Sequence, residues 1–321
     1  WGEVQPVLAA MKGAMGLSNA IIIGVFVAAL GFGIINIMLM SVFERTRFLA
    51  SMLRAAPTLL AYRPNARTSA ADLVEYCNGP AGTYWADLRG AHGYPQPHNV
   101  RYWCVGNEMD GPWQLGHVPA DQYAIRAQQA GKMMKDVDGT IELVACGSCT
   151  TGLPSYMEWD RTVLEHLGDL ADYISLHRYV GNPDDDTPDF LAVTNSIDRQ
   201  IEEMDAACRY VQARRRSAKR AYLCFDEWNV WYKDRAGNGE GQFAPHLIEE
   251  VYNLEDALVV AEFLNSFVRH ADVLKIANIA QIVNVIAPIL TKGDDLLIQS
   301  IFYPFEMYTK RRNGAALRVE V

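Results

Sequence analysis

The sequence has little cysteine. Six cysteines among 321 residues are too few for a disulfide framework in so long a chain, which favours a reducing compartment. Cys146 and Cys149 are the one close pair, at the spacing of a redox or metal motif. Because no second pair and no histidine at zinc-finger spacing accompany them, we interpret them as two small side chains at a strand end.

Positive charge is also scarce, since the formal net charge at pH 7 is −9. An acidic surface disfavours nucleic acid as a partner, whereas neutral or cationic small ligands remain open. No glycine-rich phosphate fingerprint follows any apolar run, and no histidine has metal-ligand spacing. The sequence therefore predicts neither a nucleotide-phosphate site nor a metal site.

One long apolar run stands apart from the rest of the chain. Residues 13–43 carry no charge over 31 positions, which is long enough for a membrane-spanning helix and leaves a buried helix as the alternative. The stretch GIINIMLMSVFERTRFLASMLRA, residues 33–55, resembles the end of a transmembrane helix in ABC exporter and lipoprotein-releasing permeases. We predict membrane contact through residues 19–42.

The composition changes after Ala56, where Pro57, Pro64 and Pro80 mark loops and helix ends. We therefore predict two domains, an apolar helical segment at residues 1–60 and an α/β domain at residues 61–321.

Short apolar runs rich in β-branched and aromatic residues recur in the second domain, and helical stretches separate them, which is typical of repeated βα units. The runs are residues 100–108, 141–148, 172–179, 220–228 and 275–284. Such runs fit a parallel sheet buried on both faces. A doubly wound sheet is the competing architecture, but it would need the phosphate fingerprint that is missing.

Polar residues follow these runs where the predicted strands end, and the carboxyl ends of barrel strands share one rim. Glu108 and Glu227 are the only glutamates among them. Two carboxylates facing each other across a pocket are the equipment of glycoside hydrolysis, and Trp228 and Trp231 would suit the apolar faces of a sugar.

These residues carry a resemblance to the α-L-arabinofuranosidases of glycoside hydrolase family 51. It rests on WCVGNEMDGPWQLGH (103–117), IELVACGS (141–148), YISLHRYVGN (173–182), FDEWNVWY (225–232) and AQIVNVIAPI (280–289). The resemblance implies a retaining enzyme without cofactor that releases terminal arabinofuranose from arabinan or arabinoxylan oligosaccharides. A retaining β-glucanase of the same clan is disfavoured by Met109, where those enzymes typically have proline.

The resemblance also implies individual roles. Glu108 would be the acid/base and Glu227 the nucleophile, with carboxyl groups about 5–5.5 Å apart. The residues that would bind substrate or support the nucleophile are Asn107, Trp113, His177, Tyr179 and Gln281. Each has a purely structural alternative, such as a core histidine at position 177 or a packed indole at position 113.

The runs correspond to strands four to eight of the family's (β/α)₈ TIM barrel, so we expect an incomplete barrel without the family's C-terminal β-sandwich. Open sheet edges predict impaired activity unless a partner supplies the remaining strands. The alternative function is a membrane-anchored, permease-like fragment fused to a silent partial barrel. The resemblance further implies a cytoplasmic catalytic part and leaves homo-oligomer formation open.

Overall fold

The computed structural model describes residues 66–233 and 248–310. The predicted transmembrane-like helix, the membrane contact at residues 19–42 and the predicted domain boundary at residue 60 all lie outside these residues. Within the described part of the chain, no helix combines the length and the apolar character needed to cross a membrane.

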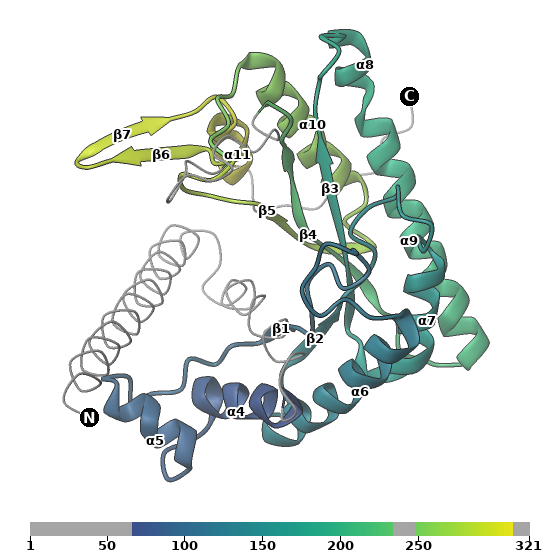
Figure 1. Cartoon of the computed structure of the whole chain (residues 1–321), viewed down its shortest axis with the longest axis vertical. Helices are drawn as coiled ribbons and strands as arrows, with labels where there is room; N and C mark the ends of the chain where they lie inside the picture. The colour runs from purple at the N-terminus through teal and green to yellow at the C-terminus, as the bar shows by residue number, and fades with distance from the viewer. Residues whose placement is uncertain (1–65, 234–247, 311–321) are drawn as a thin grey trace, which may run out of the picture. The chain divides into compact units, whose positions relative to one another are not determined.

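A five-stranded parallel sheet forms the centre of the described structure, and its strands lie side by side in chain order. They are β1 (Tyr102–Cys104), β2 (Glu142–Ala145), β3 (Tyr173–Val180), β4 (Tyr222–Val230) and β5 (Leu274–Ile279). Each falls within or overlaps one of the five predicted runs, so the prediction of a parallel α/β fold is confirmed. Figure 1 shows the sheet as curled, in the manner of part of a barrel.

Helices connect the successive strands and pack on one another along the outside of the sheet (Figure 1). They are α4 (Ala66–Asn78) and α5 (Tyr84–Ala91) before β1, α6 (Ala120–Val137) after it, α7 (Glu158–Leu167) with the 3₁₀ turn η1 (Gly168–Leu170) after β2, α8 (Thr187–Ala192) and α9 (Thr194–Arg215) after β3, α10 (Leu254–Arg269) after β4, and α11 (Phe302–Thr309) near the end. The crossovers bring all five strand carboxyl ends to the same edge of the sheet.

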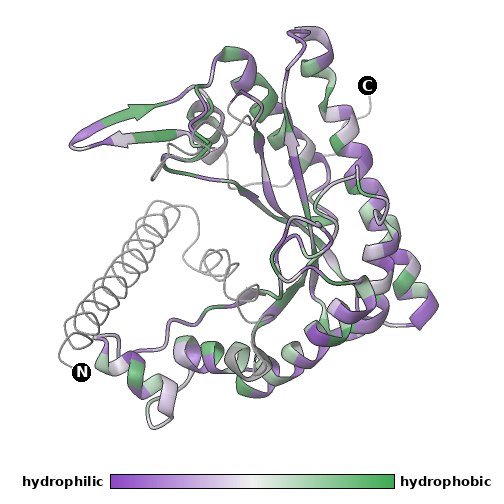
Figure 2. Cartoon of the chain, viewed as in Figure 1, coloured by the Kyte–Doolittle hydropathy of each residue, from purple (hydrophilic) through white to green (hydrophobic). Residues whose placement is uncertain are grey.

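A hairpin of β6 (Ile289–Lys292) and β7 (Asp295–Ile298) follows β5. Gly293 takes φ of +60° in its turn, a conformation that side chains disfavour. Leu296 and Leu297 on β7 are exposed, and Figure 2 shows the strands of the hairpin as largely hydrophobic and its tip as hydrophilic, whereas hydrophilic residues predominate along α9.

The core lies between the sheet and its helices. Trp228 on β4 is fully buried, and its ring centre lies 4.8 Å from that of Phe263 and 5.0 Å from that of Phe267, both on α10. Phe305 on α11 stacks against the same indole with ring centres 5.8 Å apart. This aromatic cluster fixes β4 at the residue directly after Glu227. The prediction that Trp228 faces a sugar is therefore wrong, because its indole is completely buried in the core.

Strand β4 contains a bulge near its middle. Ser175 of β3 pairs with Cys224, but His177, two residues on, pairs with Glu227, three residues on. The pairing with β5 shifts in the same interval, between Phe225 and Trp228. One extra residue on β4 breaks the alternation that would send Asp226 and Glu227 to opposite faces.

Candidate active site

Glu108 lies in the loop that follows β1, at the carboxyl edge of the sheet. Its φ of +49° falls in the left-handed region, which residues other than glycine seldom adopt and which is frequent at functional sites. The backbone N–H of Gly111 donates to the carbonyl of Glu108 over 2.8 Å and closes a tight turn. Directly after this turn, the indole Nε1 of Trp113 donates to Oε2 of Glu108 over 2.9 Å.

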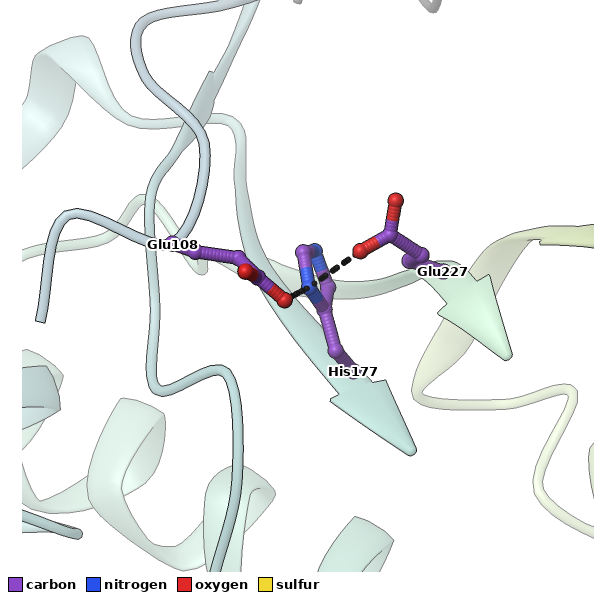
Figure 3. A group of neighbouring side chains, drawn as sticks. All are labelled: Glu108, His177 and Glu227. Atoms are coloured by element: carbon purple, nitrogen blue, oxygen red, sulfur yellow. Dashed lines mark hydrogen bonds and ion pairs between the residues drawn. The ribbon is translucent and has the colours of Figure 1, made fainter. Parts of the chain in front are cut away.

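His177 connects the two glutamates. Its Nδ1 lies 3.1 Å from Oε1 of Glu108 and 2.9 Å from Oε2 of Glu227. Figure 3 shows the imidazole of β3 between Glu108 from the loop after β1 and Glu227 from β4. A carboxylate oxygen of Glu108 and one of Glu227 lie within 4.8 Å of each other. The two carboxylates predicted from strand ends are therefore brought together.

Asp226 is the third carboxylate around this histidine. Its Oδ1 lies 3.1 Å from Nε2 of His177, and both side chains are almost completely buried, at 3% and 2% exposure. The thiol of Cys104 lies 3.7 Å from Oδ2 of the same carboxylate. The bulge in β4 allows consecutive residues, Asp226 and Glu227, to reach the two nitrogens of one ring.

The carboxylates determine the charge of His177. Burial lowers the pKa of this imidazole, but the charge of Glu227 and the hydrogen bonds to Asp226, Glu108 and Glu227 outweigh that effect and raise the pKa well above its usual range. The protonated ring donates from both nitrogens. Two carboxylates this close repel each other, and the imidazolium offsets that repulsion.

Among the described residues, Glu108, His177 and Glu227 also form the one group of such side chains close enough to share a metal ion. A metal ion binds the lone pair of a neutral imidazole nitrogen. Because Nδ1 of the protonated ring carries a hydrogen between both carboxylates, the arrangement fits an internal ion pair better than a metal site.

The other predicted substrate residues surround this centre less tightly. The ring of Tyr179 on β3 makes an edge-to-face contact with Trp231, with centres 5.2 Å apart. Asn107 is half-buried next to Glu108, and Gln281 is exposed two residues after β5. Their roles toward a substrate remain predictions.

The close cysteine pair follows the end of β2. Cys146 and Cys149 are buried free thiols, and burial raises the pKa of both. The sulfur of Cys146 accepts a hydrogen bond from the backbone N–H of Met109 over 3.3 Å. It thereby holds the residue next to Glu108 in place.

The site predicted from the sequence does not include Asp226 or Gly111. Asp226 directly precedes Glu227, and the regular alternation of a strand predicts that the two side chains point to opposite faces. The position of Gly111 against Trp113 depends on a loop conformation that the motif itself does not reveal.

Comparison with known proteins shows which family the chain belongs to. The model of the α-L-arabinofuranosidase 1 domain matches residues 25–197, and that of the α-L-arabinofuranosidase C-terminal domain matches residues 226–321. The chain belongs to the α-L-arabinofuranosidases of glycoside hydrolase family 51. The second match begins inside β4, and its described residues form α10, β5, the hairpin and α11 rather than a β-sandwich.

Two curated relatives in this family are bacterial. The intracellular exo-α-(1→5)-L-arabinofuranosidase of Halalkalibacterium halodurans is 48% identical over 257 residues, 79% of this chain and 51% of the relative. The intracellular exo-α-(1→5)-L-arabinofuranosidase 1 of Bacillus subtilis is 48% identical over 254 residues, 78% of this chain and 51% of the relative. The chain thus spans about half the length of these relatives.

A solved structure agrees with this placement. The family 51 α-L-arabinofuranosidase from Bifidobacterium longum superposes with a TM-score of 0.72 and 36% identity, covering 75% of this chain and 50% of that one. The permease resemblance of residues 33–55 finds no support in the comparisons, and the first domain match already includes these residues.

Proposed function

We propose that the chain provides the catalytic carboxylates of a retaining exo-α-L-arabinofuranosidase, with Glu108 as acid/base and Glu227 as nucleophile. The observation that carries the proposal is the pair of glutamates, one from the loop after β1 and one from β4, with carboxylate oxygens within 4.8 Å of each other. Retaining glycosidases have carboxyl groups about 5–5.5 Å apart, whereas inverting ones need about 6.5–9.5 Å to admit a water molecule.

The first step forms a bond between Glu227 and the anomeric carbon of arabinofuranose. The glycosidic bond breaks at the same time, and Glu108 gives its proton to the leaving oxygen. In the second step Glu108 takes a proton from water, and the water oxygen attacks the anomeric carbon. Glu227 then leaves as a carboxylate, so one water molecule is consumed and the anomeric configuration is retained.

The surroundings support this division of roles. His177 donates to both carboxylates, which orients Glu227 and offsets the negative charge of the pair. The half-buried glutamates, 18% and 17% exposed, are accessible to a sugar, while His177 beneath them is not.

For the substrate we propose arabinofuranosyl side chains of arabinan or arabinoxylan oligosaccharides. Asn107 would contact the sugar 2-hydroxyl, and Gln281 would reach the substrate from the end of β5. Tyr179 would support the nucleophile, and the exposed ring of Trp113 would line the pocket. The names of the curated relatives support an α-(1→5) linkage and an intracellular location of the catalytic part.

Hydrolysis of 4-nitrophenyl α-L-arabinofuranoside by the purified full chain tests the proposal. Glu227→Ala should abolish turnover, and Glu108→Ala should lower it about 10²–10⁴-fold. Azide should restore part of the activity of Glu108→Ala, because it replaces water without needing a base. Proton NMR of the first product formed should show retained configuration.

Glu306→Ala is the matched control, since Glu306 lies on α11 and pairs with Lys310 away from the site. This variant should keep wild-type turnover. Absence of turnover in the wild-type chain, or turnover that survives Glu227→Ala, would overturn the proposal.

Membrane contact through residues 19–42 and assembly into a homo-oligomer also remain predictions. Fractionation of the full chain against a variant lacking residues 1–56 tests the first, with loss of membrane partitioning expected. Sedimentation analysis tests the second.

A further inference from the structure

We propose that Trp113 is a positioning residue for Glu108, acting through its indole N–H, and that glycine is required at position 111 to seat the indole. This inference rests on the proposed role of Glu108 as acid/base. It gives Trp113 a function in proton transfer that differs from lining the pocket.

The geometry assigns one donor to each oxygen of Glu108. Nδ1 of His177 lies 3.1 Å from Oε1, and Nε1 of Trp113 lies 2.9 Å from Oε2. A carboxylate held at both oxygens cannot rotate about its last side-chain bond without breaking a hydrogen bond. The orientation of the proton-carrying group is thus fixed before a substrate arrives.

The two donors also distinguish the two oxygens. Because the donor at Oε1 is the positively charged imidazolium of His177 and the donor at Oε2 is a neutral indole, a proton on Glu108 is favoured on Oε2. The indole N–H uses one lone pair of Oε2 and leaves the other for the proton that passes to the leaving oxygen. Trp113 thereby selects the direction in which Glu108 donates.

Gly111 explains how the indole reaches this oxygen. A Cβ at position 111 would lie 2.6 Å from Cε2, 2.7 Å from Cζ2 and 3.0 Å from Nε1 of Trp113. The φ of Gly111 is outside the left-handed region, so its backbone conformation is open to other residues. The constraint on this position therefore comes from the indole and not from the backbone.

Trp113 is not a core residue, because 59% of it is exposed. Its indole ring can swing into solvent if position 111 acquires a side chain. Gly111→Ala should consequently break the contact with Glu108 while leaving the sheet and its core unchanged. Trp113→Phe should retain an aromatic ring and remove only the donor.

The contact itself can be tested without enzymatic activity. In ¹⁵N-labelled full chain, the indole N–H signal of Trp113 is the one of seven missing from Trp113→Phe. We expect this signal to move when Glu108 is changed to Gln and to move to the position of an exposed indole in Gly111→Ala. If the chemical shift of this signal stays the same in both variants, the hydrogen bond between Trp113 and Glu108 does not exist.

Enzyme kinetics on two substrates provide a second test of the proposal. The value of kcat/KM reports the first bond cleavage, which needs acid assistance for a sugar leaving group and little for 4-nitrophenolate. Trp113→Phe and Gly111→Ala should each lower kcat/KM on α-1,5-arabinobiose about tenfold more than they lower it on the aryl substrate. Trp85→Phe on α5 is the matched control and should change neither.

An equal loss on both substrates would show that Trp113 only binds sugar or supports the fold, and would overturn the positioning role. Absence of Glu227-dependent turnover in the wild type is a different result. It refutes the proposed function and the catalytic role of Trp113, while the indole signal still decides whether the contact exists.

Discussion

Nε2 of His177 lies 3.1 Å from the buried Oδ1 of Asp226, on the side of the ring opposite Glu108 and Glu227. A neutral imidazole has only one N–H and could not donate in both directions. The relationship with Asp226 therefore keeps the ring positively charged between the two candidate catalytic groups.

Replacing Asp226 with Asn should lower the pKa of His177, because one of the negative charges that raise it is removed. Glu108 and Glu227 still contact the ring, and Asp110 interacts with it electrostatically, so part of the effect should remain. Titration of the His177 ring by NMR measures the change. An unchanged titration would show that Asp226 does not hold the proton.

The same raised pKa makes stability depend on pH. Since the pKa of folded His177 is well above the unfolded value, its contribution is fully present below the unfolded pKa and is lost as pH rises through the folded one. Urea unfolding of wild type and His177→Gln should therefore show a difference in unfolding free energy that shrinks at alkaline pH. A constant difference would contradict the assignment.

Asp160 gives a second pH-dependent contribution. Burial raises its pKa from 3.8 to about 6, although Ser148 donates to it from both the backbone and the hydroxyl. Its contribution is present below pH 3.8 and lost as pH rises through about 6, a change of about 3 kcal/mol. The difference in unfolding free energy between wild type and Asp160→Asn should shrink by that order between pH 4 and 7. If the difference stays the same at both pH values, the raised pKa is wrong.

We expect the conservative substitution Arg89→Lys to lower the free energy of unfolding substantially. The guanidinium of Arg89 is fully buried and donates to four backbone carbonyls, those of Tyr76, Gly79, Tyr94 and Pro95. Lysine cannot reproduce this planar fork, and carbonyls left unpaired in the interior cost about 1–3 kcal/mol each. Arg89→Lys should lower the unfolding free energy by at least about 2 kcal/mol in urea. A loss below about 0.5 kcal/mol would contradict this reading.

Trp228→Ala should destabilise the chain by about 3–5 kcal/mol, because it empties the centre of the aromatic cluster with Phe263, Phe267 and Phe305. Trp228→Phe should cost less. Thermal unfolding of both variants measures the two losses, and equal losses would show that ring volume is not the cause.

The sequence predicts the sheet because its five strands are apolar runs with β-branched residues. Such runs are typical of a parallel sheet that is buried on both faces. The sequence also predicts the pairing of Glu108 with Glu227, since both follow predicted parallel strands. Asp226 escapes prediction because a bulge reverses the direction that alternation assigns to it. The end of β5 at Ile279, earlier than the apolar run suggests, reflects the turn toward the β6–β7 hairpin, which no strong local signal marks.

The bulge in β4 makes the chain one residue longer there than the pairing of β3 and β5 requires. Deleting a single residue at position 226 would therefore make the ladder between β3 and β4 regular. The same deletion would remove the acid behind His177 and rotate Glu227 relative to its partners. Regular pairing of β3 with β4 and the arrangement of Asp226 and Glu227 around His177 are therefore incompatible, and the extra residue in β4 favours the site.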